Sequence, residues 1–342
     1  MARHAALFIT HRGERHQQTA LGGAPPELAV TMRRSPGKDE ILALLPGQEF
    51  LITERTGEID ADIIRAGKDL RLIQRLGSQT YDIDLAAARA AGVPVCFQPV
   101  AGCIAVAEHM LLQMLATAKR LRETMAIAEA AENGGRAPGK CDEDYFAYNW
   151  ANVIDLRGLW QSTVGILGMG EIGMELARRL QGFGCTVLYH RRHPMPPAAE
   201  RELNVKYAER DALLAQSDFV CMLLPYVPET ARSLAEAFFA RMKPGACFVS
   251  CGGSGVVAEA ALAEAVRTGH LFGVAADTYS WEPIRPDDPL LILARGSRAN
   301  VILTPHVAAG GGTEHIEARA RSGDYANLMR LLRGEALLGR VA

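Results

Sequence analysis

Residues 162–173 read STVGILGMGEIG, an apolar run followed by three glycines with the spacing GxGxxG. The apolar run predicts a buried strand, and the residues from Glu171 onward have the period of an amphipathic helix. Between a strand and a helix, Gly168 permits a tight turn, Gly170 lets a ligand approach the backbone, and Gly173 lets the helix pack on the strand. This context predicts that the loop holds the pyrophosphate of a dinucleotide at the helix N-terminus, rather than merely joining two elements. The loop residues expected to bind the cofactor are Gly168, Met169, Gly170, Glu171, Ile172 and Gly173.

Strand-like runs and helical patterns alternate on both sides of this loop. Before it come ALFIT, ELAVTM, FLITE, LRLIQRLG and GVPVCF, and after it come TVLYH, FVCMLL, CFVSC, LFGVAA and NVILT. Helical patterns lie between some of these runs, namely DEILALL, DADIIRAG, EIGMELARRLQGF, ERDALLAQ, AEAFFARM and EAALAEAVRTG, with a long one at about residues 104–130 and a last one at about residues 314–332. The alternation predicts an α/β fold with parallel sheets, in two domains with a ligand cleft between them. Residues 132–150 lack periodicity and predict a surface loop or a cover over a site.

The composition narrows the kind of partner. The 342 residues carry a formal net charge of −2, and their basic clusters are short, so we expect a small-molecule substrate and no nucleic acid. No apolar run reaches the roughly 18 residues of a membrane span, and no signal-peptide pattern opens the sequence. The seven cysteines are odd in number and scattered, which favours reduced thiols and offers no four-ligand metal site. We therefore expect a cytoplasmic protein with no membrane partner and no metal.

The end of the next strand-like run, TVLYH, bears on which dinucleotide is bound. A carboxylate at this point would hold the free ribose hydroxyls of NAD, but the sequence has Arg191 and Arg192 there instead. A guanidinium group fits a 2′-phosphate with two hydrogen bonds, so the pair favours NADP. The alternatives are that the arginines form a solvated turn and that NAD is the cofactor.

Six stretches of the sequence form a pattern together, in the order LIQRLGSQTYDIDLAAARAAGVPV, VAEHMLLQMLATAKR, DLRGLWQSTVGILGMGEIG, MKPGACFVS, AADTYSWEPIRPDDPLL and NVILTPHVA. They resemble stretches of the D-isomer-specific 2-hydroxyacid dehydrogenases, the group with phosphoglycerate dehydrogenase, glyoxylate/hydroxypyruvate reductase and formate dehydrogenase. The resemblance implies a flavodoxin-like substrate domain from residues 1–102 plus 311–342, and an NAD(P)-binding Rossmann domain from residues 103–310. It also implies a homodimer, formed through the nucleotide domain and the helix that VAEH opens.

A histidine and a glutamate are the expected catalytic pair. Reduction of a carbonyl by hydride needs a proton donor, and a histidine beside a carboxylate can supply the proton near neutral pH. His306 ends the run NVILTPH, and Glu282 follows the neighbouring run. By resemblance, His306 is the acid/base and Glu282 orients it, while Asp277 bonds the nicotinamide carboxamide or, alternatively, caps the turn that follows it. The expected cofactor-binding set also includes Pro225, Thr230, Cys251, Gly252, Asp277 and His306.

Two positions depart from the family pattern. The family's arginine for the substrate carboxylate falls on Gly253, and its loss should cost about 2 to 5 kcal/mol, or roughly 30-fold to several-thousand-fold in kcat/KM. Gly77, Ser78 and Gln79 stand where the family's backbone amides hold that carboxylate, and Gln79 is either a contact residue or a solvent-facing loop residue. Three explanations stay open: a substrate without an α-carboxylate, another cation such as Arg285 or Lys140, or a protein that is no longer a dehydrogenase.

The leading hypothesis is an NADP(H)-dependent oxidoreductase that acts by hydride transfer on a carbonyl or 2-hydroxy substrate that is unusual for the family. One rival is a nucleotide-sensing binding protein. Another is an enzyme that uses bound NAD(P) for an internal redox step. Retention of both Glu282 and His306 argues against a pure binding protein, which has no chemical need of the pair.

Overall fold

The computed structural model describes residues 3–54, 57–296, 299–310 and 321–342. The chain divides into two compact units. Unit 1 consists of Met1–Ala101 with Gly311–Ala342, and unit 2 consists of Gly102–Gly310. Each unit has its own parallel sheet, so the predicted α/β fold is confirmed.

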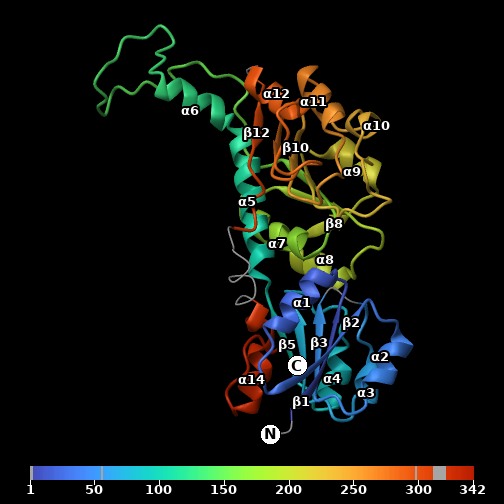
Figure 1. Cartoon of the computed structure of the whole chain (residues 1–342). Helices are drawn as coiled ribbons and strands as arrows, with labels where there is room; N and C mark the ends of the chain where they lie inside the picture. The colour runs from blue at the N-terminus through green and yellow to red at the C-terminus, as the bar shows by residue number, and fades with distance from the viewer. Residues whose placement is uncertain (1–2, 55–56, 297–298, 311–320) are drawn as a thin grey trace. The chain divides into compact units, whose positions relative to one another are not determined.

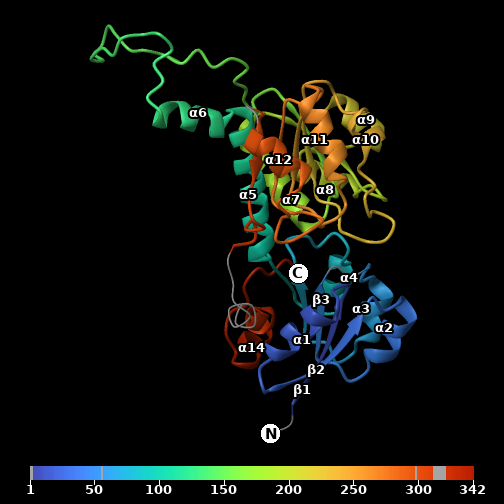
Figure 2. The same cartoon turned by 45° about the horizontal axis from the view of Figure 1, so that its top comes forward.

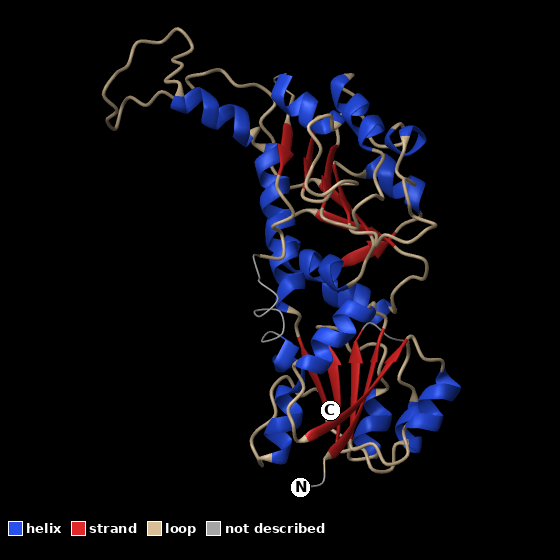
Figure 3. Ribbon diagram, in the orientation of Figure 1, coloured by secondary structure: helices blue, strands red, loops and turns tan. Residues whose placement is uncertain are grey.

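Unit 1 is a five-stranded parallel sheet with helices on both faces (Figure 1 and Figure 3). The strand order is β2-β1-β3-β4-β5, which is the flavodoxin-like order. The strands are β1 (His4–Thr10), β2 (Leu28–Arg34), β3 (Phe50–Glu54), β4 (Leu72–Leu76) and β5 (Val95–Gln98). The helices are α1 (Glu14–Gly22), α2 (Lys38–Leu44), α3 (Ala61–Ala66), α4 (Leu85–Ala90) and α14 (Ala326–Leu332), with the 3-10 turn η2 (Gly323–Tyr325) before α14.

Alternate residues of β1 show how the unit 1 sheet separates two cores. Leu7 and Ile9 pack in the cluster that includes residues of α2, α3 and α4, whereas Phe8 packs with Tyr325 and Leu328 from the C-terminal segment. Side chains alternate between the two faces of a strand, so a continuous apolar run such as ALFIT suits a strand covered on both sides.

Unit 2 is a seven-stranded parallel sheet with the order β12-β11-β10-β9-β6-β7-β8. The strands are β6 (Thr163–Leu167), β7 (Thr186–His190), β8 (Val205–Tyr207), β9 (Phe219–Met222), β10 (Cys247–Ser250), β11 (Gly273–Ala276) and β12 (Val301–Leu303). The helices are α5 (Ala101–Ala118), α6 (Leu121–Glu129), α7 (Glu171–Leu180), α8 (Pro197–Leu203), α9 (Arg210–Gln216), α10 (Glu236–Phe239), α11 (Glu259–Arg267) and α12 (Pro289–Gly296), with the 3-10 turn η1 (Gln181–Phe183) after α7. From β6, the strands up to β8 are added on one side and the strands from β9 onward on the other, so the order of strands reverses between β6 and β9. Ligands of such sheets bind beside this switch point.

The long helical pattern predicted at residues 104–130 is two helices, which corrects the prediction. The backbone of Arg120 is left-handed, with φ 50°, and it separates α5 from α6. Helix α5 is long and apolar enough to cross a membrane by length and composition alone, and half of it is buried inside the protein. Its residues Met110 and Met114 are in the core of unit 2.

Helix α6 and much of the segment after it extend away from the sheet of unit 2 in both views (Figure 1 and Figure 2), and the chain is back against unit 2 at Arg157, whose guanidinium lies 3.8 Å from the centre of the Phe272 ring. The structure buries no residue of α6. The segment at residues 132–150, predicted as a surface loop or a cover, follows α6, and most of its residues are exposed.

Some elements were not predicted from the sequence, namely α1, α4, α8, α12 and β8. The predicted last helix at residues 314–332 begins outside the described residues. Its described part is the turn η2 followed by α14.

A buried ion pair joins the two sequence segments of unit 1. Glu54, at the end of β3, is almost fully buried and accepts from Arg321 at 3.0 and 3.3 Å and from the Thr10 hydroxyl at 2.9 Å. Burial alone would raise the pKa of Glu54, but the hydrogen bond and the charge of Arg321 outweigh it and hold that pKa below its usual value. The pair therefore fastens the C-terminal segment to the N-terminal sheet.

The substitution Glu54→Gln should lower the free energy of unfolding of unit 1 by about 3 kcal/mol, because the largely buried Arg321 guanidinium loses one of its two carboxylate partners and keeps only Asp324. The measurement is hydrogen exchange of the unit 1 strands against urea concentration, at pH 8. Asp287→Asn, which breaks an exposed pair with Arg285, is the matched control and should leave the exchange midpoint unchanged. Equal behaviour of the two variants would show that Glu54 does not fasten the segment.

Candidate dinucleotide site and catalytic pair

The three glycines of the loop between β6 and α7 have the distinct environments that the sequence predicted. Gly168 has φ 95°, and a Cβ there would lie 2.7 Å from the backbone of Leu223. A Cβ at Gly173 would lie 2.9 Å from Gly168 O, so glycine is required for the helix to pack on the turn. A Cβ at Gly170 would meet nothing within 4 Å, so this side of the loop is open to a ligand.

The remaining loop residues offer their backbone rather than their side chains. Met169 and Glu171 are buried, and Ile172 packs against the core of unit 2. Gly170 is the N-cap of the ten-residue α7 and carries no side chain that could cap it. The N–H groups and the positive end of the helix dipole therefore suit the pyrophosphate of a dinucleotide.

The two arginines that bear on NADP lie beside this loop. Leu167 pairs with His190 in the sheet, and the Gly168 N–H donates to His190 O at 3.0 Å. Arg191, which is half-buried, and Arg192, which is exposed, follow directly. Both therefore stand at the carboxyl end of β7, next to the glycine turn.

The loops after β9 and β10 use the predicted Thr230 and Cys251 for their own structure. The Thr230 hydroxyl donates to Pro225 O at 2.8 Å and accepts from the Val227 N–H at 2.9 Å, which closes the loop after β9. Cys251 is buried, and its thiol donates to Gln113 Oε1 at 3.2 Å. Burial raises the pKa of the Cys251 thiol, and the nearby charge of Asp277 raises it further. Contacts of Cys251 with a cofactor would therefore come from its backbone.

Gly252 and Gly253 let these two loops approach each other closely. A Cβ at Gly252 would lie 2.5 Å from the Met222 sulfur, and a Cβ at Gly253 would lie 2.2 Å from Tyr226 N. Both distances are far below a van der Waals contact, so the two loops can pack this closely only because neither residue has a side chain.

Glu282 and His306 are in direct contact. His306 Nδ1 lies 2.7 Å from Glu282 Oε2. The other carboxylate oxygen of Glu282 accepts from the Ser254 hydroxyl at 2.8 Å and from the Tyr279 N–H at 3.0 Å. The His306 side chain remains 54% exposed, so a substrate can reach the imidazole while the carboxylate is held from three directions.

These contacts keep Glu282 ionised. Partial burial raises the pKa of Glu282, but hydrogen bonds from His306, the Tyr279 N–H and Ser254 outweigh burial and leave that pKa below its usual value. An ionised carboxylate against an imidazole stabilises the positive charge that the ring acquires with a proton. The pair can therefore move a proton to or from a reacting oxygen.

Asp277 holds the loop that carries His306. It is fully buried, and its Oδ1 accepts from the Thr304 hydroxyl at 2.6 Å and the Val307 N–H at 3.0 Å, while Oδ2 accepts from the Ala308 N–H at 2.9 Å. His306 itself has a left-handed backbone, with φ 52°. The alternative prediction was that Asp277 caps the turn that follows it. These three hydrogen bonds are instead with residues of the loop after β12. The contact of Asp277 with nicotinamide stays a prediction.

Two polar residues of this site were missed from the sequence. Ser254 holds Glu282, and Gln113 of α5 donates to the Thr304 hydroxyl at 3.2 Å. No sequence motif marks a serine in a glycine-rich turn or a glutamine in an apolar helix as part of an active site. Only the fold brings them to the carboxyl edge of the sheet.

The predicted substrate loop is in unit 1. Gly77 has φ 137°, and its N–H donates to Gln98 O at 2.8 Å. Ser78 is half-buried, and Gln79 is only 3% exposed, so Gln79 is not a solvent-facing loop residue. Its Nε2 is buried with no hydrogen-bond partner within the described part of the chain. An unpaired amide donor costs about 1 to 3 kcal/mol, which a ligand oxygen would recover.

This chain is similar to several known proteins. Residues 114–308 match the NAD-binding domain model of the D-isomer specific 2-hydroxyacid dehydrogenases. The chain is 34% identical over 283 residues to glyoxylate/hydroxypyruvate reductase B of Pectobacterium carotovorum, which covers 82% of this chain and 81% of that protein. It is 32% identical over 282 residues to D-3-phosphoglycerate dehydrogenase of Archaeoglobus fulgidus, which covers 82% of this chain and 49% of that one.

The chain spans about half the length of the phosphoglycerate dehydrogenases that it matches. A solved glyoxylate reductase from Paecilomyes thermophila superposes with a TM-score of 0.53 at 26% identity, over 100% of this chain and 99% of that one. The glycine loop, the sheet order and these matches together show that the chain belongs to the D-isomer specific 2-hydroxyacid dehydrogenase family.

Proposed function

We propose that this protein is an NADP(H)-dependent oxidoreductase that interconverts a carbonyl group and the corresponding alcohol, with unit 2 binding the cofactor. The observation that carries the proposal is the contact of 2.7 Å between His306 Nδ1 and Glu282 Oε2. The names of the relatives support it, since they include a glyoxylate/hydroxypyruvate reductase and a phosphoglycerate dehydrogenase.

The residues of the pair have separate roles in the proposed reaction. When bound, the nicotinamide supplies or accepts the hydride at the substrate carbon. Glu282 occupies Nδ1, so His306 Nε2 gives its proton to the carbonyl oxygen during reduction and takes the proton back during oxidation. Glu282 stabilises the charged imidazole before reduction, and Ser254 fixes the carboxylate in that orientation.

We propose NADP rather than NAD because Arg191 and Arg192 follow β7 directly beside the glycine turn. A 2′-phosphate at this position would gain charge-assisted hydrogen bonds, whereas the free ribose hydroxyls of NAD would meet no carboxylate at these two positions. Gly170 and the N-terminus of α7 would hold the pyrophosphate.

We propose that the substrate is unusual for the family at the group next to its carbonyl. The position that matches the family's arginine by resemblance is Gly253, where no side chain fits. Arg285 makes two hydrogen bonds to Asp287, so its charge is already paired. Lys140 is exposed on the segment that follows α6. A substrate without an α-carboxylate accounts for these observations with the fewest changes.

We also propose that the protein is a homodimer through the segment of residues 119–158. A nine-residue helix is marginal alone, and α6 has exposed apolar residues, Leu121 and Met125. Phe146 and Tyr148 farther along are 71% and 80% exposed, and clustered exposed aromatic residues mark interaction surfaces. A second copy of the chain, with the same segment, would cover these residues in a symmetric contact.

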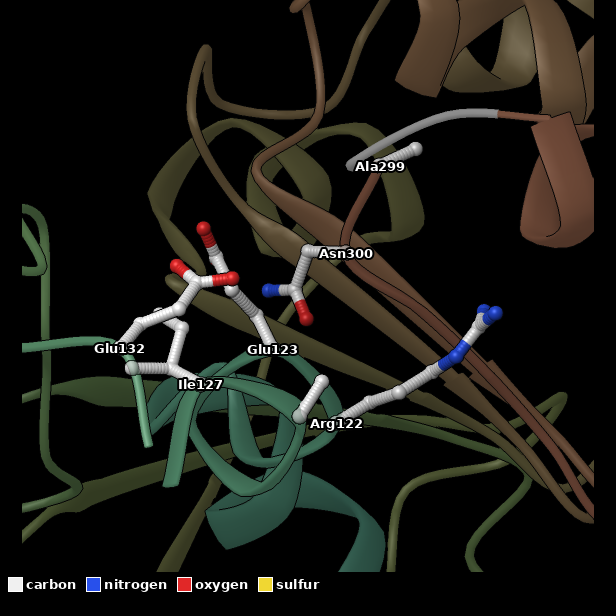
Figure 4. Close-up of a pocket in the computed structure, with 7 residues that line it drawn as sticks. Arg122, Glu123, Ile127, Glu132, Ala299 and Asn300 are labelled. Carbon is white, nitrogen blue, oxygen red and sulfur yellow. The ribbon is translucent and has the colours of Figure 1, made fainter. Parts of the chain in front are cut away.

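A cavity of about 240 Å³ adjoins α6 and gives a partner residue a place to insert. Figure 4 shows the carboxylates of Glu123 and Glu132 beside Asn300, while the side chain of Arg122 extends away from them.

We propose a cytoplasmic location, since all seven cysteines are free. Burial raises the pKa of the Cys247 thiol to about 12 and that of Cys221 well above its usual value. Such thiols stay protonated and inert.

The substitution His306→Ala should reduce NADPH-dependent turnover of any active ketone, aldehyde or 2-oxo acid by about 10²-fold to 10⁴-fold, because the proton donor is lost. The affinity for NADPH, measured by its fluorescence, should stay the same. His4→Ala removes a histidine that contacts a glutamate, Glu49, at 2.9 Å in unit 1, and this control should keep full turnover. Unchanged turnover in His306→Ala would sink the proposed function.

Replacement of both Arg191 and Arg192 by serine should weaken NADPH binding by about 10-fold to 100-fold, through loss of charge-assisted hydrogen bonds, and should leave NADH binding unchanged. Titration of each nucleotide by calorimetry measures this. Serines at Arg33 and Arg34, a pair in unit 1, are the control. Parallel losses for NADPH and NADH would count against the NADP preference.

Serines at both Phe146 and Tyr148 should convert a dimer to a monomer in sedimentation velocity at micromolar concentration, since they remove the apolar contact that we propose. Leu338→Ser, at an apolar residue of unit 1 that is 58% exposed, should sediment as the wild type does. A wild-type protein that sediments as a monomer contradicts the proposal.

A further inference from the structure

The loops after β9 and β10 meet at Gly253 through backbone atoms. The Gly253 N–H donates to Leu224 O at 2.8 Å. A Cβ at Gly253 would lie 2.2 Å from Tyr226 N and 2.9 Å from Pro225 C. Neither atom belongs to a side chain that could rotate away, so a side chain fits at this position only if the loop after β9 moves. The loss of a side chain here is therefore part of how the two loops pack.

Tyr226 contacts the same turn a second time with its ring. A Cβ at Gly255, where φ is 80°, would lie 3.3 Å from Tyr226 Cε2. The backbone of Tyr226 thus abuts Gly253 and its ring abuts Gly255. Between the two glycines is Ser254, whose hydroxyl donates to Glu282 at 2.8 Å. The aromatic ring is therefore beside the residue that holds the catalytic carboxylate.

The Tyr226 side chain remains 57% exposed although its ring lies against the turn. The nearby Arg232 joins the turn through its backbone, since its N–H donates to Gly255 O at 2.9 Å, and its side chain is exposed. An aromatic ring offers broad apolar contact and a preference for flat partners, but no full charge for a carboxylate.

We infer that Tyr226 is a specificity-determining residue, and that the group beside the reacting carbonyl is an uncharged flat group that packs on its ring. This inference rests on the proposed oxidoreductase function and names its substrate class as aryl or unsaturated ketones and the matching alcohols. Tyr226 then takes part in substrate selection from the loop after β9, whereas Gly253, in the loop after β10, provides no side chain.

Two matched pairs of probes test the inference. 1-Phenylpropane-1,2-dione and phenylglyoxylate share an aryl ketone, and the first has an acetyl group where the second has a carboxylate. 2,3-Butanedione and pyruvate differ in the same way, but each has a methyl group in place of the phenyl ring. Binding to the full-length protein is measured by calorimetry with NADP⁺ present, because the oxidised cofactor cannot reduce the probes. NADPH turnover is measured separately.

We expect the phenyl dione to bind more tightly than phenylglyoxylate. Tyr226→Ala should weaken its binding by about 10-fold, and Tyr226→Phe, which keeps the ring, by less than about 2-fold. Binding of 2,3-butanedione should change by less than about 3-fold in either variant. Tyr145→Ala, at an exposed tyrosine of the segment after α6, is the control and should bind every probe as the wild type does.

Several outcomes would overturn the inference: no binding of the phenyl dione to the wild type, equal weakening of all probes by Tyr226→Ala, or tighter binding of phenylglyoxylate that Arg232→Gln abolishes. Tyr226-dependent binding without any NADPH turnover would support the inference and reject the proposed function. NADPH turnover of the phenyl dione at the same rate in Tyr226→Ala and wild type would support the proposed function and reject the inference about Tyr226.

The steric premise has its own measurement. Gly253→Ala should lower the melting temperature, because the new Cβ meets backbone atoms, whereas Gly182→Ala, with no atom within 4 Å of its Cβ, should not. A Gly253→Ala variant as stable as Gly182→Ala would show that the loops have room for a side chain, and that Tyr226 does not close this position.

Discussion

A single buried carboxylate, that of Asp277, sets the geometry of the candidate active site. Burial of a charge is costly unless hydrogen bonds compensate for it, and Asp277 accepts three, from Thr304, Val307 and Ala308. Two of these donors are backbone N–H groups that flank the C-terminal side of His306. The left-handed conformation of His306, which is unfavourable for a non-glycine residue, is therefore fixed by its surroundings.

The parallel sheet brings the other parts of the site to the same edge. Strands β6, β7, β9, β10, β11 and β12 all end there, so a glycine turn, an arginine pair, two close-packed loops, Glu282 and His306 come together from segments that are far apart in sequence. Their local structures depend on one another. Ser254 can reach Glu282 only because Gly253 and Gly255 allow the turn between them.

The sequence predicted the elements whose signal is local. The GxGxxG loop has a strand before it and a helix after it, and its glycines lie where that pattern requires, as the structure shows for Gly168 and Gly173. The contact between Glu282 and His306 was also expected, but only through resemblance to a family, because the two residues are 24 positions apart. Helix α1 was missed because its sequence, ERHQQTALG, is mostly polar and buries only Ala20.

Other features depend on packing that no local pattern encodes. The break between α5 and α6 occurs at Arg120, an ordinary helix former, and no glycine or proline marks it. Gln79 could be read as a surface residue or a contact residue, and only the fold shows that it is buried. The interpretation of Gly253 differs most between sequence and structure. The sequence shows only that the family's arginine is missing there, whereas the structure shows that the backbone of Tyr226 lies too close to Gly253 for a side chain.

The Glu54–Arg321 pair also bears on how the protein folds as it is made. Unit 2 is one continuous stretch of chain, whereas the core of unit 1 includes Tyr325 and Leu328, which are synthesised after all of unit 2. One apolar face of the first strands of unit 1 therefore stays uncovered until the whole of unit 2 and the segment after it have left the ribosome. Since domains fold as units during synthesis, unit 2 can complete its fold first, and until then the uncovered apolar face of β1 and β3 is exposed to aggregation.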